Sequence, residues 1–485
     1  MKIKRLCGEL NLISLLAVYT YAFKFIEKLY GLIFMNSLKM FLRHKIALGV
    51  IACGFTLSAC SSSNVVVSNT QAEANKPQNI IMVVADGMGP AYTTAYRYFK
   101  DDPNTSIIEE TALDSILTGT ARTYPASVSG LVTDSAASAT SLAAGVKTYN
   151  GAIGLDVNKK PVETVLHRAK TQGMKTGVAV TSQIVHATPA AYIAHNESRR
   201  NYNQIADSFL DDRLNGMPKA DVMLGGGWDY FLREDRNLVE EFKSLGYQYA
   251  DSYEALDSLE TGKATLGLFA NMGLPRALDD SSQTRLSTLT KHALKHLENP
   301  NGFFLLVEAS QVDWAGHGND IASAMYEMAD LEASILLLKE YVKENPDTLV
   351  VLTADHSTGG LTIGAKGEYR WSPEFLHNMT ASTSYIASKL FEQDDRVAFV
   401  ESKFGFELNT DEQNRIAAIE QGMKSRAVEA VLKTIIDERT NTGWTTSGHT
   451  GVDVEVFAFG KGADNFLGNM DNIDIASKIF DLLEK

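Results

Sequence analysis

Six short apolar runs between residues 79 and 459 constrain the fold of this chain more than any other feature. They are hydrophobic at successive rather than alternate positions and rich in valine, isoleucine and phenylalanine: 79–85, 176–181, 222–224, 303–307, 348–353 and 454–459. Such runs are typical of strands buried on both faces of a mainly parallel sheet. Helical patterns separate them, at 162–172, 286–297 and 322–344, and another closes the chain at 473–483. We therefore expect an α/β fold, a three-layer sandwich in which helices flank a mainly parallel central sheet.

The pattern changes between about residues 361 and 442, where helical sequence continues without any buried-strand run. This segment interrupts the sheet between two predicted strands. We expect an inserted helical subdomain, which is a candidate for a lid or for a contact between subunits.

The first 60 residues have the pattern of a targeting region. The segment from Met40, MFLRHKIALGVIACGFTLSAC, has a basic start, an apolar stretch and small residues before Cys60, as signal peptides do. Its end, LSAC at 57–60, resembles a bacterial lipobox, in which the cysteine is lipidated and becomes the mature N-terminus. The alternative is an ordinary cleaved signal in which Cys60 is incidental.

The targeting pattern also sets the expected boundaries. Translation is expected to start at Met35 or Met40, so that 1–60 is the targeting region, 61–78 a flexible tether and 79–485 the catalytic domain. The expected location is the periplasmic side, with a lipid anchor on Cys60. By resemblance to bacterial lipoproteins, Ser61 after the cysteine would favour the outer membrane over the inner one.

Composition excludes several kinds of partner and site. The chain has 45 Lys and Arg against 59 Asp and Glu and a net charge of −14, without a long basic run, so we expect no nucleic-acid-binding surface. The cysteines are Cys7, Cys53 and Cys60, all in the targeting region. The body of the chain therefore has neither a disulfide framework nor a thiolate metal site.

Potential metal ligands follow almost every predicted strand, at the edge where ligands gather in open α/β sheets. They are Asp86 after 79–85, His186 and Thr188 after 176–181, Glu308, Asp313 and His317 after 303–307, Asp355 and His356 after 348–353, and His449 before 454–459. Each has an ordinary alternative in isolation: a turn, a surface ion pair or a loop position. Together, from distant parts of the chain, they predict one metal centre.

The spacing of these residues adds three expectations. Asp313 and His317 are four positions apart and share a helix face, which suits two ligands of one ion. Asp355 and His356 are adjacent, so joint ligation requires that the chain has left the strand by then. Glu308 directly follows the run FFLLV and is expected to be half-buried, with a partner for its charge.

The ligand types suit more than one ion. Imidazole and carboxylate groups suit zinc, whereas the all-oxygen set of Asp86, Thr188 and Glu308 suits magnesium. Two neighbouring zinc ions can stabilise the attacking and leaving oxygens of an in-line displacement.

The stretch TDSAASAT at 133–140 consists almost entirely of small residues. Its plain interpretation is a tightly packed helix capped by Asp134. The alternative is a nucleophilic Ser135 at a helix N-terminus, where backbone N–H groups face an anion and a metal activates the hydroxyl. Arg199, in HNESRRNYN, can hold two phosphate oxygens, while Arg200 beside it is expected in solvent.

Several motifs together resemble bacterial alkaline phosphatases, in order and across residues 79–485. They are VVADGMG, VTDSAASATSLAAGVKTYNGAIG, HATPAAYIAHNESR, LGGG, VEASQVDWAGHG, LTADHSTGG and SGHTGVDVEVFAFG. The resemblance implies hydrolysis of phosphate monoesters at alkaline pH through a phosphoserine on Ser135, with release of inorganic phosphate. It also implies a homodimer, for which 361–442 is the candidate contact.

The resemblance further implies two zinc ions and one magnesium ion per chain. One zinc would bind Asp313, His317 and His449, the other Asp86, Asp355 and His356 with Ser135, and magnesium would bind Asp86, Thr188 and Glu308. Arg199 would bind the phosphate.

Two positions depart from the enterobacterial pattern and make the chain more similar to the marine, cold-active Vibrio-type enzymes, which also carry a large insertion. His186 stands where the enterobacterial enzymes have aspartate, and Trp314 where they have lysine. His186 is expected to bind the third metal, to contact it through water, or to admit zinc there. Trp314 removes a positive charge beside the substrate, which is expected to speed product release.

Two other functions remain open from the sequence. A metal-dependent phosphodiesterase of the same superfamily usually has threonine as nucleophile and lacks the DSAAS context. A non-catalytic, lipid-anchored binding protein would not be expected to keep the complete ligand set.

Overall fold

The structure is a computed structural model that describes residues 76–282 and 284–484. The predicted targeting region 1–60 and most of the predicted tether therefore lie outside the described residues. Within the described ranges, no helix combines the length and the apolar character that a membrane span requires.

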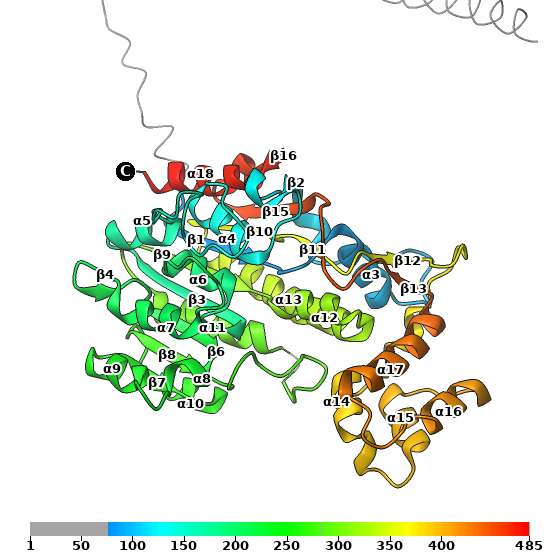
Figure 1. The fold of residues 1–485 in the computed structure, drawn as a ribbon. Coiled ribbons are helices and arrows are strands. Elements are labelled where there is room, and N and C mark those ends of the chain that lie inside the picture. Colours follow the sequence, from blue (N-terminus) through cyan, green and yellow to red (C-terminus); the bar gives the residue numbers. More distant parts are fainter. Residues whose placement is uncertain (1–75, 283, 485) are drawn as a thin grey trace, which may run out of the picture. The chain divides into compact units, whose positions relative to one another are not determined.

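A ten-stranded sheet forms the centre of the molecule, in the order β16-β2-β15-β10-β1-β9-β3-β6-β8-β7 (Figure 1). The six predicted runs are all strands: β1 (Asn79–Val84), β3 (Lys175–Gln183), β6 (Val222–Gly226), β9 (Phe303–Glu308), β10 (Thr348–Thr353) and β15 (Val454–Gly460). All residues of β6, β9 and β10 are buried, as successive apolar positions predict. The α/β prediction is confirmed.

The sheet is parallel except around β15, which runs antiparallel to both of its neighbours, β10 and β2. Four strands had no clear signal in the sequence: β2 (Leu117–Arg122), β7 (Gln248–Ala250), β8 (Thr265–Leu268) and β16 (Gly468–Asp471). All four lie at or next to an edge of the sheet, and three of them, β2, β7 and β16, have little apolar sequence. Their sequences, LTGTAR, QYA and GNMD, are short or polar because these positions need little apolar side chain.

Helices cover the sheet in two layers (Figure 1). One layer contains α3 (Pro90–Lys100), α11 (Arg285–Leu297), α12 (Gln311–Gly318) and α13 (Ile321–Glu344), and the other contains α4 (Ser135–Ala144), α5 (Val165–Thr171), α6 (Ala187–Ile193) and α18 (Asn472–Leu483). The helix predicted at 162–172 begins only at Val165, because the Thr164 hydroxyl accepts from the His167 amide and caps it there. The remaining small elements of the body are α7 (Tyr202–Asp211), α8 (Trp228–Phe231), α9 (Leu238–Ser244), α10 (Tyr253–Asp257), β4 (Arg213–Leu214) and β5 (Met217–Pro218).

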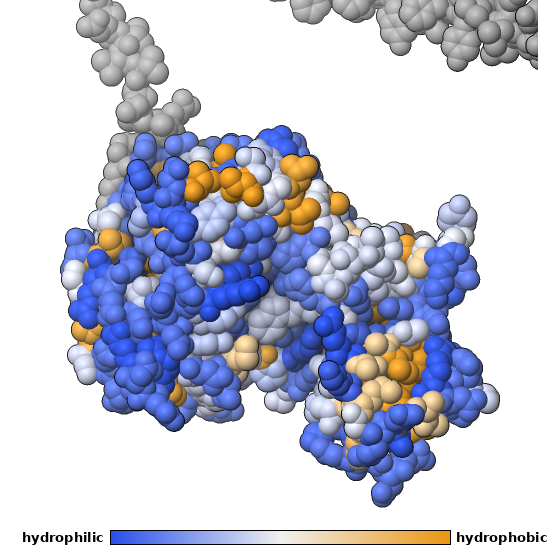
Figure 2. All heavy atoms as spheres, in the orientation of Figure 1, coloured by the Kyte–Doolittle hydropathy of each residue, from blue (hydrophilic) through white to orange (hydrophobic). Residues whose placement is uncertain are grey.

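The segment predicted as an insertion leaves the body through a two-stranded ribbon, in which β12 (Leu361–Ile363) pairs antiparallel with β13 (Thr442–Trp444). Between these strands lie α14 (Thr383–Lys389), α15 (Arg396–Phe404), α16 (Thr410–Ala417) and α17 (Ser425–Thr440). In Figure 1 this group, called the insertion below, projects away from the sheet, and Figure 2 shows apolar surface on it beside the mostly hydrophilic body. The Thr383 hydroxyl donates to Asp320, the N-cap of α13, and ties the insertion to the body.

Candidate metal centre

The register of three central strands brings the predicted acidic ligands together. Val84, the last residue of β1, pairs with Thr353 of β10 on one side and with Glu308 of β9 on the other. The chains that leave these strands therefore start from one edge of the sheet, which places Asp86, Asp355 and Glu308 close together. Asp355 and His356 come after the end of β10, so both side chains can face the same site, as joint ligation requires.

Two short elements complete the centre. β11 (Ser357–Thr358) pairs antiparallel with β14 (His449–Thr450), which stacks the His449 ring on that of His356 with 3.6 Å between their centroids. The helix α12 carries Asp313 and His317 on one face, with 3.4 Å between Asp313 Oδ2 and His317 Nε2. The predicted shared helix face is therefore present.

Asp313, His317 and His449 form the first cluster, whose ligand atoms lie within 4.8 Å of one another. His317 Nδ1 lies 2.6 Å from the Ser447 carbonyl and His449 Nδ1 lies 2.9 Å from the Thr133 carbonyl. Because a carbonyl can only accept, both Nδ1 atoms carry a proton and both Nε2 atoms are acceptors. These two acceptors face each other at 3.1 Å. Such an arrangement fits a cation that both nitrogens bind.

Asp86, Asp355 and His356 form the second cluster, and all three side chains are fully buried. His356 Nε2 lies 3.5 Å from Asp86 Oδ1 and 3.2 Å from Asp355 Oδ2. Both carboxylate oxygens of Asp86 and Oδ2 of Asp355 lack a hydrogen-bond partner among the described residues. Buried carboxylate oxygens without a donor are costly unless a cation compensates them.

Burial also explains the pKa values of the second cluster. Burial, reinforced by the neighbouring carboxylates, raises the pKa of Asp355 to about 8 and that of Asp86 well above its usual range. Burial also holds the pKa of His356 well below its usual range. His356 is therefore a neutral imidazole, the form that binds metal ions.

Asp86, His186 and Glu308 form the third cluster, so Asp86 is shared with the second. Glu308 Oε2 accepts from Ser310 Oγ at 2.6 Å and Ser182 Oγ at 3.2 Å, but Oε1 has no partner among the described residues. Glu308 is completely buried, so the prediction that it would be half-buried was wrong. The cause is that β1 and β3 flank its strand on both sides, and burial raises its pKa to about 7.

Thr188 and His186 flank the third cluster from the β3–α6 segment. The Thr188 hydroxyl is buried close enough to Glu308 to lower the pKa of that carboxyl, and it has no other partner among the described residues. His186 Nε2 lies 3.2 Å from Arg199 Nη2, which can only donate, so Nδ1 carries the proton in this arrangement. That proton has no acceptor among the described residues, so it is free to donate to a ligand of a bound ion.

The predicted nucleophile lies next to the second cluster. Asp134 caps α4 by accepting from the Ala137 amide at 3.0 Å, and Ser135 is its first helical residue. Ser135 Oγ lies 3.1 Å from His356 Nε2. Arg199 Nη1 lies 3.1 Å from Asp134 Oδ2, which orients the guanidinium. Asp134 therefore caps the helix, as the plain interpretation predicts, and Ser135 lies beside the metal centre, where the nucleophile interpretation requires it.

The remaining predicted residues also have definite places. The Trp314 ring meets the His186 ring edge-on, with 5.9 Å between centroids. Arg200 is exposed and is not among the groups that contact the clusters. The residues that the fold gathers at one site are Asp86, Ser135, His186, Thr188, Arg199, Glu308, Asp313, Trp314, His317, Asp355, His356 and His449.

Sequence reasoning missed several supporting residues. The Thr358 hydroxyl donates to Asp313 and lies 3.2 Å from His356 Nδ1, so it orients one ligand of each of two clusters. A Cβ on Gly87 would lie 2.6 Å from the Asp313 Cα, and one on Gly273 would lie 2.3 Å from the Trp314 ring. The short motifs DHSTGG and ADGMG contain Thr358 and Gly87, but only the fold reveals what each approaches.

Buried unpaired carboxylates, neutral imidazoles, a serine at a helix N-terminus and a nearby guanidinium define a class of protein, the metal-dependent enzymes of phosphoryl transfer. The comparisons with known proteins identify the family. The sequence model of alkaline phosphatases matches residues 77–485, and the chain belongs to that family. It is a phosphatase of phosphate monoesters, in a family that uses divalent metal ions.

Individual relatives cover most of the chain. Alkaline phosphatase 3 of Bacillus subtilis is 43% identical over 84% of this chain and 89% of its own length. A crystal structure of a cold-active alkaline phosphatase from the psychrophile Shewanella sp. is 51% identical, with a TM-score of 0.79 over 84% of this chain and 100% of the other. The alkaline phosphatase of the Antarctic bacterium TAB5 is 26% identical, with a TM-score of 0.63 over 84% of this chain and 98% of the other.

Proposed function

We propose that the chain hydrolyses phosphate monoesters at alkaline pH through a covalent phosphoserine on Ser135, with two zinc ions and one magnesium ion. The observation that carries the proposal is the position of Ser135 Oγ, 3.1 Å from His356 Nε2 at the start of α4. A hydroxyl at this place lies beside both the second cluster and the helix N-terminus, where an anion is stabilised.

The three clusters give each ion its own chemistry. The first and second clusters, which combine imidazole with carboxylate groups, suit zinc, and the all-oxygen group of Asp86, Thr188 and Glu308 suits magnesium. When bound, the ions supply Lewis acidity, which lowers the pKa of a hydroxyl and neutralises charge on phosphate oxygens. The unpaired oxygens of Asp86, Asp355 and Glu308 support this assignment.

The protein side chains bind and orient the reacting groups. Arg199 turns its guanidinium to two phosphate oxygens while Asp134 holds its other side. Ser135 Oγ then bonds to phosphorus as the bond to the leaving oxygen breaks, and the serine proton passes through solvent to that oxygen. In the second half, a water oxygen bonds to phosphorus, the bond to Ser135 breaks, and the serine regains a proton.

The third site is where this chain differs from the enterobacterial pattern. We propose that His186 contacts a ligand of the third ion through its Nδ1 proton, since Arg199 donates to Nε2. Two variants of the TAB5 enzyme, in which a histidine is replaced by glutamate or aspartate, have magnesium in the site called M3. We propose that His186 corresponds in role to that histidine.

The location and the assembly are also proposals. A lipid anchor on Cys60 would hold the enzyme on the periplasmic side, preferably at the outer membrane, but Cys60 lies outside the described residues. A homodimer with the insertion as its contact is the proposed assembly.

The test of the mechanism compares Ser135→Ala with the wild-type chain, both loaded with zinc and magnesium. We expect nitrophenyl phosphate hydrolysis to rise with pH and to fall by roughly 10³-fold or more in the variant, since the nucleophile is lost. Acid quenching during turnover should leave phosphate on Ser135, detectable by mass spectrometry. Faster hydrolysis of the bis(nitrophenyl) diester would instead indicate a phosphodiesterase, and full metal binding without either activity would indicate a binding protein.

A further inference from the structure

A hollow of about 680 Å³ lies beside the first cluster, between the end of α12 and one side of α17. We call it the α17 hollow, and its lining includes His317, Gly318, Arg426, Glu429 and Lys433. Its volume is in the range of pockets that bind small molecules. The Lys433 ammonium donates to the Gly318 carbonyl at 2.6 Å and fixes this part of α17 against α12.

The hollow begins where a leaving group would depart. Ser135 lies against His356 of the second cluster, and in an in-line displacement the leaving oxygen lies opposite the attacking one. The first cluster lies beside the second, because the His449 ring stacks on the His356 ring, and it is the cluster next to the hollow, which makes it the side available to the leaving oxygen. His317 is its exposed member, with 42% of the side chain accessible, against 5% for Asp313 and 12% for His449. A leaving group bound to the centre therefore extends past His317 into the α17 hollow.

Arg426 is the unpaired cation of this hollow. Its exposed guanidinium has no hydrogen bond or ion pair with any residue at 76–282 or 284–484. The neighbouring Glu429 is engaged elsewhere, because it accepts from Ser425 Oγ at 3.2 Å and lies 3.8 Å from Lys433 Nζ. The remaining acid, Asp437, lies eleven positions along α17, roughly 16 Å away by helical rise.

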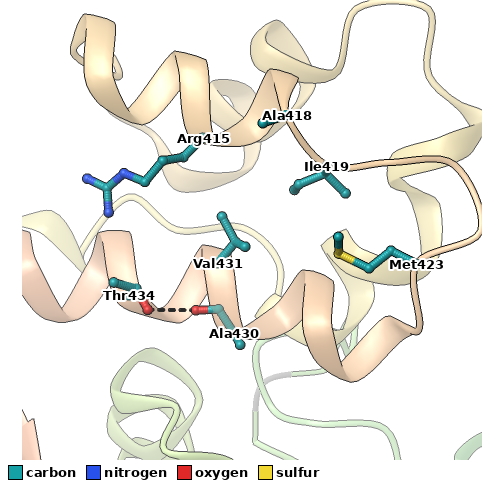
Figure 3. A pocket seen from close by; sticks show the side chains of 7 residues that line it. All are labelled: Arg415, Ala418, Ile419, Met423, Ala430, Val431 and Thr434. Carbon is teal, nitrogen blue, oxygen red and sulfur yellow. Dashed lines mark hydrogen bonds between the residues drawn. The ribbon is translucent and has the colours of Figure 1, made fainter.

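Another side of α17 provides a contrast. Together with α16 and the loop that follows it, that side lines a smaller hollow of about 390 Å³ with Ile419, Met423 and Val431 (Figure 3). Its arginine, Arg415, is paired with Asp411 at 3.0 Å and with Glu438 at 2.8 Å. The lining is apolar and both terminal nitrogens of Arg415 are ion-paired, so that hollow presents no free charge to an anion.

We propose that the α17 hollow binds the leaving group of the substrate, and that Arg426 selects phosphate monoesters whose leaving group carries a second anionic group, a phosphate or a carboxylate. Arg426 lies seven positions before Lys433, so the second anion would bind roughly 10 Å along the helix from the Lys433–Gly318 contact. A guanidinium binds either anion through two charge-assisted hydrogen bonds. The inference rests on the proposed function and narrows its substrate class.

The experiment measures kcat/KM of the zinc- and magnesium-loaded chain with two substrate pairs. The phosphate arm compares fructose 1,6-bisphosphate with fructose 6-phosphate, and the carboxylate arm compares 3-phosphoglycerate with glycerol 3-phosphate. We expect the wild type to prefer the doubly anionic member of at least one pair by roughly tenfold, the usual effect of a charge-assisted hydrogen bond. Arg426→Glu should abolish that preference.

Lys424→Glu is the matched control, because it makes the same change of charge two residues away and Lys424 does not line the hollow. It should keep the wild-type preference within about twofold. Equal loss of preference in both variants, or no preference in the wild type, would overturn the role of Arg426. If the metal-loaded wild type hydrolysed no monoester at all, the proposed function itself would be overturned. That result is distinguishable from a failure of the Arg426 proposal alone.

Discussion

The metal centre and the insertion are two regions of one chain that differ in how their residues are held. The centre is built on the ends of β1, β9 and β10, and Asp86, Glu308 and Asp355 are completely buried there. The insertion is a group of helices reached through a two-stranded ribbon, and its functional candidate, Arg426, is exposed. In the centre, strand register and burial determine which ligands meet and how they titrate. The insertion adds a binding surface whose residues can change without altering the sheet.

The largest expected effect comes from Asp86→Asn, because Asp86 belongs to two clusters. Asparagine keeps the shape but removes the charge, so we expect a loss of roughly 10³-fold in kcat/KM, the equivalent of several kcal/mol of transition-state stabilisation. Metal analysis should find less zinc and less magnesium. The metal-free variant should be more stable than the metal-free wild type, because it no longer buries a carboxylate whose pKa burial and the neighbouring carboxylates raise well above the usual range.

The control for this variant lies in the insertion. Asp411→Asn changes a carboxylate that is 79% exposed, so the free energy of unfolding should stay within about 0.5 kcal/mol of the wild type. Activity and metal content should be unchanged. If Asp86→Asn kept full metal content, the assignment of the second and third clusters would be wrong.

Phe404→Ala tests whether the insertion can be weakened separately from the centre. Phe404 is fully buried at the end of α15, so its truncation should cost about 3–5 kcal/mol of local stability. Hydrolysis of nitrophenyl phosphate at low temperature should remain within a few fold of the wild type. The matched variant Phe304→Ala, in β9 four residues before Glu308, should instead lower both stability and metal content.

Limited proteolysis measures how the two phenylalanine variants differ in local stability. Urea unfolding, followed by one signal from the insertion and one from the metal centre, measures the same difference. Cleavage confined to residues 361–442 in Phe404→Ala would support separable regions. Equal loss of metal from both phenylalanine variants would mean that the insertion and the centre unfold as one unit.

The two regions should also differ in their response to pH. Burial raises the pKa of Asp437, on α17, from 3.8 to about 7, while it accepts a hydrogen bond from Trp444 Nε1 at 3.2 Å. The folded state therefore holds this proton more tightly than the unfolded state. The stability that the proton provides is complete below about pH 4 and is lost as the pH rises to about 7, at most roughly 2–4 kcal/mol.

Asp437→Asn keeps the acceptor for Trp444 and removes the charge. Hydrogen exchange of α17 should slow in this variant at pH 8. The free energy of opening, obtained after correction for the pH dependence of intrinsic amide exchange, should no longer change between pH 4 and 7. Unchanged pH dependence would show that another group is responsible.

The contrast between the two regions also explains what the sequence could predict. Successive apolar residues marked all six central strands, and parallel strands end at a common edge, so the amino-acid pattern alone was enough to place the ligands at one site. The antiparallel direction of β15 does not show in its apolar run, and β16 at the edge of the sheet and β2 next to it have too little apolar sequence to be detected. The full burial of Glu308, the link from Thr358 to Asp313 and the α17 hollow depend on contacts between distant segments, which periodicity does not encode.

The smallest expected effect concerns Trp314, at the rim of the buried centre. Its ring lies edge-on to His186 and over Gly273, so it provides packing without charge. Trp314→Lys should add a cation near the phosphate, and a charge several Å away in a wet site is worth about 0.5 kcal/mol. The inhibition constant for inorganic phosphate should therefore fall by roughly two- to threefold at low salt, and the effect should shrink as salt is added. Trp314→Phe, which changes packing but not charge, should show no such fall. The inhibition constant for phosphate could instead stay the same in Trp314→Lys or fall equally in both variants. Either result would show that the charge at position 314 does not control product release and that this position acts only through its size.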